Sequence, residues 1–297
     1  PMNKYLVFRT DRIGDFLLSA ILIKSIKDKD KDSHVTVVSS KKNYEYIKSY
    51  KLVDEVFLLN NNFFEKIKLI VKLRKLFFHS IILHDNKKRS HLISLFLNTK
   101  KKITISKYSQ LSHIKIIKKI LYTCNFNFDE SALDFLEAKN IDDFKIKDFI
   151  HLHFDEKWIH DNYIKNYINI EPSKKQLSDF LNLLITKTSK KLVITTGLNS
   201  PKVLDEAIKE RENVNILYFK NLSFLELEKV VIKSDVLISC HGSVSHLAAA
   251  KNIKQIDIID KSYNYSRWTE HFRNYTFINR DNFSNLTQQI LGNLRNF

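Results

Sequence analysis

Glycine is the residue that this sequence most clearly lacks. The 297 residues contain four glycines, at positions 14, 197, 242 and 292, whereas average usage of about 7% would give roughly twenty. Four widely separated glycines cannot form the G-x-G-x-x-G turn of a dinucleotide-binding dehydrogenase or the G-x-x-x-x-G-K-[ST] loop of a P-loop enzyme. Because glycine is so scarce, we expect the remaining ones to serve a backbone purpose.

Cysteines and long apolar runs are also scarce. Cys124 and Cys240 lie in apolar stretches without metal-ligand spacing, which is typical of a reducing compartment and not of a disulfide framework. His151 and His153 share one face of a strand but have no third ligand in view, so we expect no metal. The start, PMNK, has no signal-peptide region, and no apolar run is long enough to span a bilayer. We therefore expect a cytoplasmic protein.

Positive charge is in excess, with a formal net charge of +16. Such a charge suits a nucleic acid, an anionic membrane surface or a phosphorylated substrate. Aromatic residues are not interleaved with the basic clusters, so no nucleic acid is expected, although a basic α/β nucleic-acid-binding protein remains the alternative. The cluster Lys66–Lys75 is interpreted as a solvated helix face. The cluster Lys115–Lys119 is interpreted in the same way, but this helix could also rest on an anionic membrane, because three isoleucines accompany its lysines.

Short apolar strands alternate with helical stripes along the chain. Tyr5–Arg9 and Phe16–Lys27 form the first pair, and the alternation restarts at Phe149–Phe154 after an acidic, poorly periodic passage, Glu130–Asp148. This alternation predicts parallel sheets with helices on both faces. We predict an α/β protein of two Rossmann-like domains, residues 1–148 and 149–297, that face each other across a cleft. The C-terminal helix could pack back on the first domain.

The stretch SDVLISCHGSVSHLAAA, residues 234–250, is a short buried strand, a tight turn and a helix. Amides at such a helix start are unpaired and lie at the positive end of the helix dipole, so they favour an anion such as phosphate. Gly242 allows close backbone approach or a positive φ. Ser243 and Ser245 can cap the helix or bond a phosphate, and His241 and His246 flank the turn. An ordinary strand–loop–helix is the alternative interpretation.

A second candidate edge lies near the start of the chain. The loop TDRIGD, residues 10–15, follows one strand, and HDNKKR, residues 84–89, follows another. The carboxyl ends of parallel strands lie at one edge of a sheet, where ligands gather. Asp15 is either a functional carboxylate or a simple helix-start acid.

These residues resemble glycosyltransferase family 9, the ADP-heptose lipopolysaccharide heptosyltransferases. RTDRIGDFLLSA is similar to that family's R-x-x-x-x-G-D-x-x-x-[ST] opening, and residues 234–250 are similar to its D-T-G-x-x-H-L-A-A-A signature. Glu156–Trp158 matches a basic residue before a Trp, and Val193–Gly197 matches a strand with a glycine turn. The resemblance covers nearly the whole chain.

The resemblance implies a GT-B fold and an inverting glycosyltransferase without a metal or other cofactor. A nucleotide-diphosphate sugar would bind the C-terminal half, and an anionic bacterial surface glycan or glycolipid, such as a lipopolysaccharide core, the N-terminal half. Peripheral contact with the inner membrane is also possible on this interpretation. Asp15 would be the general base, and Lys157 would neutralise the diphosphate. The other donor-side candidates are Gly197, His241, Gly242, Ser243, Ser245 and His246. The acceptor-side candidates are Arg12, Gly14, Asp85, Lys87 and Arg89.

The sequence departs from the family pattern at the donor turn. His241, Gly242 and Ser243 stand where the family has Asp, Thr and Gly, and the missing Asp is a residue that the family uses on the donor sugar. The segment DKSYNYSRW, residues 260–268, also lacks the family's F-G-P-T turn. The resemblance therefore leaves the sugar, heptose or another, and the base open. A catalytically inactive sugar-nucleotide-binding subunit is a further alternative.

Overall fold

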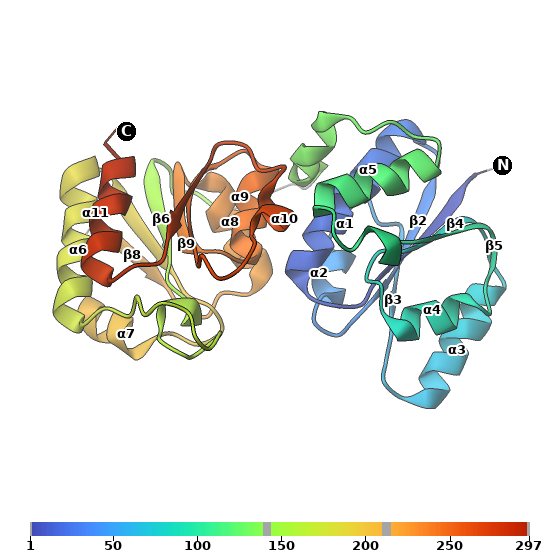
Figure 1. The fold of residues 1–297 in the computed structure, drawn as a ribbon, viewed down its shortest axis with the longest axis horizontal. Coiled ribbons are helices and arrows are strands. Elements are labelled where there is room, and N and C mark those ends of the chain that lie inside the picture. The colour runs from blue at the N-terminus through green and yellow to red at the C-terminus, as the bar shows by residue number, and fades with distance from the viewer. Residues whose placement is uncertain (1, 139–143, 210–214, 296–297) are drawn as a thin grey trace. The chain divides into compact units, whose positions relative to one another are not determined.

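The computed structural model describes residues 2–138, 144–209 and 215–295. The chain forms two compact units, each an α/β structure around one parallel sheet (Figure 1). Unit 1 comprises Pro1–Asn140 and Ser266–His271, and unit 2 comprises Ile141–Tyr265 and Phe272–Phe297. The two-domain α/β class predicted from the alternation of elements is thereby confirmed. The cleft between the domains stays a prediction.

Unit 1 contains a five-stranded parallel sheet in the order β3-β2-β1-β4-β5. Its strands are β1 (Lys4–Arg9), β2 (His34–Ser39), β3 (Glu55–Leu58), β4 (Phe77–Leu83) and β5 (Asn98–Thr104). Its helices are α1 (Ile13–Lys29), α2 (Tyr44–Lys48), α3 (Phe63–Arg74), α4 (Lys88–Ser94), α5 (His113–Thr123) and α10 (Ser266–Thr269), with 3₁₀ segments η1 (Ser106–Tyr108) and η2 (Glu130–Ala138).

Helices cover both faces of this sheet (Figure 1), and its central strand β1 is buried from Tyr5 to Arg9, with the apolar run Tyr5–Phe8 in its middle. Leu6 and Phe8 of β1 share one hydrophobic cluster with Leu69 of α3 and Ile93 of α4. A strand buried on both faces reads as a continuous apolar run, which is why β1 was recognisable in the sequence. On α5, the three isoleucines at positions 116, 117 and 120 are buried in the unit's interior. These isoleucines are therefore not available to a membrane, and the exposed Lys115, Lys118 and Lys119 form a solvated helix face.

Unit 2 contains a six-stranded parallel sheet in the order β11-β10-β9-β6-β7-β8. Its strands are β6 (Phe149–His153), β7 (Lys191–Thr195), β8 (Ile216–Phe219), β9 (Val236–Cys240), β10 (Lys254–Ile259) and β11 (Tyr275–Asn279). Its helices are α6 (Lys174–Thr188), α7 (Lys202–Lys209), α8 (Phe224–Lys233), α9 (Ser243–Ala250) and α11 (Phe283–Asn293), with the 3₁₀ turn η3 (Glu156–Trp158).

The division of the chain differs in two respects from the expected one. Phe144 and Ile146 pack against Phe149 in the interior of unit 2, so the expected boundary at 148/149 falls inside that unit. The terminal helix α11 buries its apolar stripe in unit 2, where Phe283 contacts Phe180 of α6 with ring centroids 5.6 Å apart. It is α10, and not α11, that joins unit 1. Residues 139–143 of the expected linking passage lie outside the described residues.

Each sheet has one point where the direction of strand addition reverses. In unit 1 the chain adds β2 and β3 on one side of β1 and then β4 and β5 on the other. In unit 2 it adds β7 and β8 on one side of β6 and then β9 to β11 on the other. Loops diverge at such switch points and leave a crevice at the carboxyl ends of the two strands. The switch points therefore lie between β1 and β4 and between β6 and β9.

No helix within the described residues combines the length and the apolar character that are needed to cross a bilayer.

Candidate active site

At the switch point of unit 1, Asp85 ties the loop after β1 to the loop after β4. Its Oδ2 atom accepts hydrogen bonds from Thr10 N at 3.3 Å, Thr10 Oγ1 at 2.5 Å and Ser90 Oγ at 2.6 Å. Arg89 adds a bond from Nη2 to the Thr10 carbonyl at 2.5 Å. Asp85 was predicted to bind the acceptor. It is buried and instead fixes the conformation of the loop through these hydrogen bonds. Arg89 is half-buried and also contributes to the same anchoring.

A buried arginine organises the same loop: it is Arg9, the first residue of the R-x-x-x-x-G-D opening, which was not among the expected site residues. Arg9, the last residue of β1, donates from Nε to the Asp15 carbonyl at 2.8 Å and from Nη1 to the His84 carbonyl at 2.9 Å. It also pairs with Asp11 at 3.2 Å. The signal that could have identified it is a charged residue inside an otherwise apolar strand, because buried charges are normally paired.

Asp15 lies in the first turn of α1, at the mouth of this loop. Its Oδ2 atom accepts a hydrogen bond from the Arg12 amide at 3.2 Å, which fixes the side chain at the helix start. Asp15 and Gly14 are half-buried and Arg12 is exposed, so solvent reaches the loop. A carboxylate that is held in place and still accessible can accept a proton from an alcohol. The helix-start role and the functional role are thus compatible in one residue.

Asp11 is a second carboxylate in this loop, and its acidity is unusual. Burial raises its pKa to about 6, the Arg9 guanidinium acts in the opposite direction, and the nearby charges of Asp15 and Asp85 raise it further. Three carboxylates, of Asp11, Asp15 and Asp85, and two guanidinium groups, of Arg9 and Arg89, therefore share the switch point of unit 1. Lys87 lies beside them and is exposed, so it is an acceptor-side candidate that an anionic ligand can reach.

At the switch point of unit 2, Lys157 is held by a buried carboxylate. Its ammonium pairs with Asp155, and the Asp155 carboxylate also lies 3.5 Å from Nε2 of His153. Burial acts to lower the pKa of Lys157, but Asp155 outweighs it and holds that pKa above its ordinary value. Burial acts to raise the pKa of Asp155, but Lys157 and His153 hold it well below its usual range. Lys157 therefore keeps its positive charge.

Gly242, at the end of β9, lies directly against Lys157. A β-carbon at position 242 would lie 3.1 Å from Nζ and 3.3 Å from Cε of Lys157. The φ angle of Gly242 is 179°, an extended conformation that any residue adopts. The sequence suggested two reasons for a glycine at position 242, a positive φ or the close approach of another group. The structure favours the second, because the Lys157 side chain lies against this backbone. At Gly197 a β-carbon would lie 2.7 Å from Oε2 of Glu156, so the same reason applies there.

The turn between β9 and α9 is fixed by a buried carboxylate on β10. Ser245 Oγ accepts from the Gly242 amide at 3.2 Å and donates to Asp257 Oδ1 at 2.9 Å. Because Ser245 is fully buried, it positions the turn and does not face a ligand. The helical pattern leaves the amides of Ser243 and Val244 without a helix carbonyl. They are the groups of this turn that can serve an anion.

Asp257 also orients His241. Its Oδ2 atom lies 2.6 Å from Nδ1 of His241 and accepts a bond from the Tyr275 hydroxyl at 2.9 Å. The pairing directs Nε2 of His241 away from β10. His246, by contrast, is buried, and its ring packs edge-on against Phe272 with centroids 5.1 Å apart. Of the two histidines expected at the donor turn, His241 is therefore the one placed for a ligand. Asp257 was missed because it lies within an expected strand and carries no turn signal.

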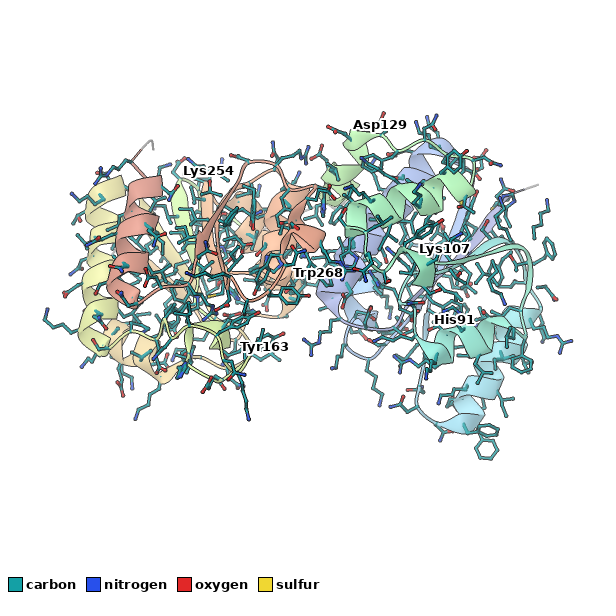
Figure 2. All side chains as sticks on the ribbon, viewed as in Figure 1. His91, Lys107, Asp129, Tyr163, Lys254 and Trp268 are labelled. Atoms are coloured by element: carbon teal, nitrogen blue, oxygen red, sulfur yellow. The ribbon has the colours of Figure 1, made fainter. Side chains whose placement is uncertain are left out.

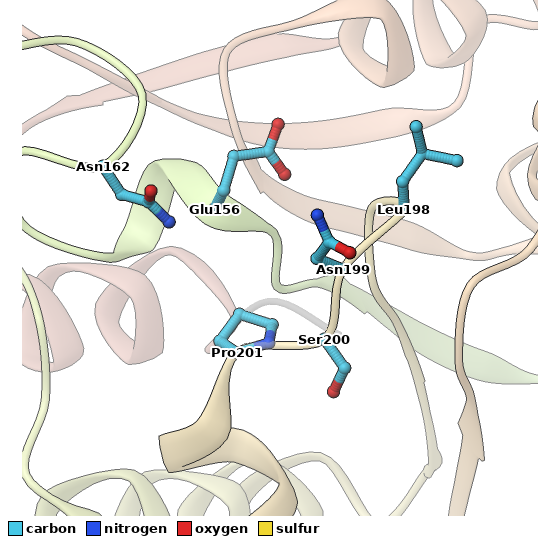
Figure 3. A pocket seen from close by; sticks show the side chains of 6 residues that line it. All are labelled: Glu156, Asn162, Leu198, Asn199, Ser200 and Pro201. Carbon is cyan, nitrogen blue, oxygen red and sulfur yellow. The ribbon is translucent and has the colours of Figure 1, made fainter.

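A cavity opens beside these groups in unit 2. Its volume is about 280 Å³. The turn after β6 forms one wall and the loop between β7 and α7 forms the other (Figure 3). The lining residues are Glu156, Asn162, Leu198, Asn199, Ser200 and Pro201. Glu156 precedes Lys157 in the chain and lies against Gly197, so one wall of the cavity belongs to the turn that carries Lys157.

Comparisons with known proteins locate the fold. The sequence matches no protein-family model and no curated protein. Among solved structures, the E. coli heptosyltransferase WaaC with ADP matches with a TM-score of 0.73 and 12% identity, covering 98% of this chain and 99% of that chain. The glycosyltransferase family 9 protein from Veillonella parvula DSM 2008 matches with a TM-score of 0.69 and 9% identity, covering 94% and 86%. The chain has the heptosyltransferase fold.

This heptosyltransferase fold is the GT-B architecture that the resemblance implied, with one parallel-sheet α/β unit in each half. The fold is not confined to transferases. The UDP-GlcNAc 2-epimerase from Methanocaldococcus jannaschii matches with a TM-score of 0.59 and 10% identity, covering 100% of this chain and 92% of that chain. At these identities the likeness establishes the fold, and the function is argued from the residues at the two switch points.

Proposed function

We propose that the protein is a glycosyltransferase that uses a nucleotide-diphosphate sugar as donor. The observation that carries the proposal is the Lys157–Gly242 contact at the switch point of unit 2, where a half-buried ammonium held by Asp155 and the start of α9 lie together. A fixed cation and unpaired helix amides at one point form a binding site for an anion. A diphosphate is the anion that a sugar nucleotide carries.

The donor's nucleoside is assigned to the cavity next to this contact. The cavity has the volume and mixed lining suited to a small ligand, with the Glu156 carboxylate and the Asn199 amide on its walls. Two of the solved neighbours offer support, since one was determined with ADP and another with UDP. His241 completes the donor side, where its Nε2 meets the phosphates or the sugar.

In the proposed reaction, Asp15 is the general base. The acceptor hydroxyl oxygen attacks the anomeric carbon of the donor sugar, the bond from that carbon to the diphosphate oxygen breaks, and the configuration inverts. The proton of the hydroxyl passes to the Asp15 carboxylate. Lys157 and the α9 amides stabilise the negative charge that develops on the departing nucleoside diphosphate. The proposal needs no metal ion for this role, since these groups supply the positive charge.

The proposed acceptor is an anionic bacterial surface glycan or glycolipid of the lipopolysaccharide type, modified on the cytoplasmic side of the inner membrane. Lys87 and Arg12 are exposed cations at the switch point of unit 1, and the net charge of +16 favours an anionic partner. The transferred sugar, heptose or another, depends on His241, which stands where the family has an acid.

Donor binding provides the first test. Melting temperature is measured with ADP, UDP, GDP, their sugar conjugates and duplex DNA, each with and without EDTA. We expect one nucleotide diphosphate to raise the melting temperature by binding the folded state, with or without EDTA. Lys157→Met should abolish the shift, whereas Lys175→Met, at an exposed site on α6, should retain it. A shift with DNA alone would favour a nucleic-acid-binding protein, and no shift with any nucleotide would contradict the proposal.

Turnover separates the remaining alternatives. A UDP-sugar 2-epimerase is the second candidate, because that fold covers the whole of this chain. It would convert UDP-GlcNAc without any acceptor, whereas the proposed transferase requires an acceptor glycan. Binding of a sugar nucleotide without either reaction would identify a catalytically inactive sugar-nucleotide-binding subunit.

A further inference from the structure

Exposed apolar side chains are concentrated on one part of unit 1. Among the described residues, sixteen large hydrophobic side chains are exposed, and half of them lie within residues 63–96. Scattered exposed apolar residues need no explanation, but a contiguous group indicates an interaction surface. We call this group the α3–α4 face. Its members are Phe63, Phe64, Ile67, Val71, Phe77, Leu92, Leu95 and Phe96.

The face arises because α3 is apolar on two sides. Leu69 and Leu73 bury one side of the helix in the unit's interior. Phe63, Ile67 and Val71 recur at four-residue intervals, which places them together on another side, open to solvent. Side chains of α3 project away from the unit (Figure 2). An apolar side that the protein's own interior does not use needs another reason for its presence.

The end of α4 extends this surface. Ile93 and Leu97 are buried in the same hydrophobic cluster as the inner side of α3. Leu92, Leu95 and Phe96 alternate with them and are 59%, 70% and 50% exposed. The two helices thus pack on one hydrophobic cluster and lie next to each other in unit 1 (Figure 1), and each carries apolar residues on its outward side.

Positive charge surrounds the apolar residues. Between residues 61 and 102 the chain has eleven Lys or Arg and two Asp or Glu. Lys68 and Lys72 lie on α3 and Lys75 directly follows it, and all three are exposed. Long lysine side chains can lay their apolar stems along a surface while their ammonium groups reach an anionic layer. Apolar residues rimmed by lysines are the pattern of a helix that lies in a membrane interface.

We propose that the α3–α4 face docks the protein on an anionic lipid bilayer. The aromatic and aliphatic side chains enter the boundary between headgroups and acyl chains, and the surrounding lysines contact the anionic headgroups. Charge argues against a second copy of the chain as the occupant. A two-fold symmetric contact would place this basic surface against itself. The contact is peripheral and involves α3 and α4, not α5.

Vesicle flotation tests the proposal without donor or acceptor, so its outcome does not depend on the proposed function. The full chain is mixed with phosphatidylcholine vesicles that contain either no phosphatidylglycerol or a large share of it. We expect binding to the anionic vesicles and a decrease in that binding as salt is raised. Equal binding to both vesicle types, or none to either, would overturn the proposal.

Two sets of variants locate the contact. Phe63→Ser with Phe64→Ser should weaken anionic-vesicle binding by about tenfold or more. The reason is that two phenyl rings are then no longer transferred from water into the lipid. Both residues are exposed, at 69% and 72%, so folding should be retained, as circular dichroism would verify. The matched control is Tyr122→Ser on α5, whose side chain is 78% exposed. Lys75→Glu with Lys88→Glu should also weaken binding, and Lys175→Glu should not.

Sedimentation equilibrium distinguishes the other occupants. If the wild type self-associates and Phe63→Ser with Phe64→Ser makes it monomeric, while vesicle binding is unchanged, the face is a dimer contact and the proposal is wrong. Equal vesicle binding by this variant and the Tyr122→Ser control would likewise overturn it.

Discussion

Gly242 and Lys157 approach so closely that a β-carbon on Gly242 would lie 3.1 Å from the Lys157 ammonium nitrogen. The neighbouring carboxylate of Asp155 fixes that ammonium, so the lysine cannot move freely to make room. Lys157, the cation that we assign to the donor diphosphate, can therefore keep its position only if residue 242 has no side chain larger than a hydrogen atom.

Gly242→Val is expected to weaken nucleotide diphosphate binding by at least tenfold, because charge-assisted hydrogen bonds to the displaced lysine are lost. The loss in free energy of unfolding should stay below about 2 kcal/mol, since the extended backbone at 242 suits valine and the clash is with a side-chain end. Calorimetry and chemical denaturation measure the two effects. Gly292→Val, with no neighbour within 4 Å of the added β-carbon, is the control. Nucleotide diphosphate binding within about twofold of the wild type, or a loss of stability well above about 2 kcal/mol, would contradict the prediction.

Asp15→Asn is expected to lower turnover by about 10²–10⁴-fold, the usual contribution of a general base. Donor affinity should hardly change, because the donor is assigned to unit 2. Turnover with a glycan acceptor and calorimetric donor binding are measured side by side. Asp28→Asn, at the far end of α1 where Asp28 pairs with Lys24, is the matched control. Near-normal turnover of Asp15→Asn would exclude this residue as the base.

Lys87→Ala should raise the acceptor KM at low salt, and the effect should shrink as salt is added, because an exposed charge is screened. Lys31→Ala removes an equally exposed charge from the loop before β2, at the opposite edge of the sheet, and should leave the KM unchanged. Arg89→Ala should affect stability as well, since Arg89 donates to the Thr10 carbonyl. An unchanged KM for Lys87→Ala at low salt would leave this lysine as a solvated loop residue.

His241→Ala is expected to weaken donor binding, because the ring is held by Asp257 at Nδ1 and its Nε2 is assigned to the phosphates or the sugar. Calorimetry with the nucleotide diphosphate is the measurement. His160→Ala, at an exposed histidine paired with Asp161, should bind the donor as the wild type does. Unaltered binding by His241→Ala would rule the histidine out.

Asp11→Asn should stabilise the protein at neutral pH. The carboxyl has a pKa of about 6 when folded, against an ordinary value of 3.8, so the folded state binds more protons between these values. Stability is therefore lost as pH rises from about 4 to about 6, and the full cost, up to about 3 kcal/mol, applies above that range. Denaturation at pH 7.5 should show the gain, and denaturation at pH 4 should not. Asp28→Asn is the control, and a gain independent of pH would contradict the assigned cause.

Local sequence determined the elements that make up the two candidate sites. The apolar runs before Thr10 and His241 are strands because parallel strands buried on both faces are apolar throughout. The turns after them begin helices, as the capping residues and scarce glycines indicated. Since strands alternate with helices, their carboxyl ends had to lie on one edge of each sheet, which brought residues 10–15 and 84–89 together in advance of any structure.

Only the tertiary structure decided what each side chain does there. Asp85 and Ser245 are residue types that often bind ligands. Both are buried, however, and their hydrogen bonds hold Thr10 and Gly242 in place instead. Asp257 orients His241 from another strand, and no local pattern records a contact of that kind. Helical periodicity likewise could not tell which apolar side of α3 the interior takes. Side-chain chemistry and spacing belong to the sequence, whereas burial and the pairing of charges depend on packing between residues far apart in the chain.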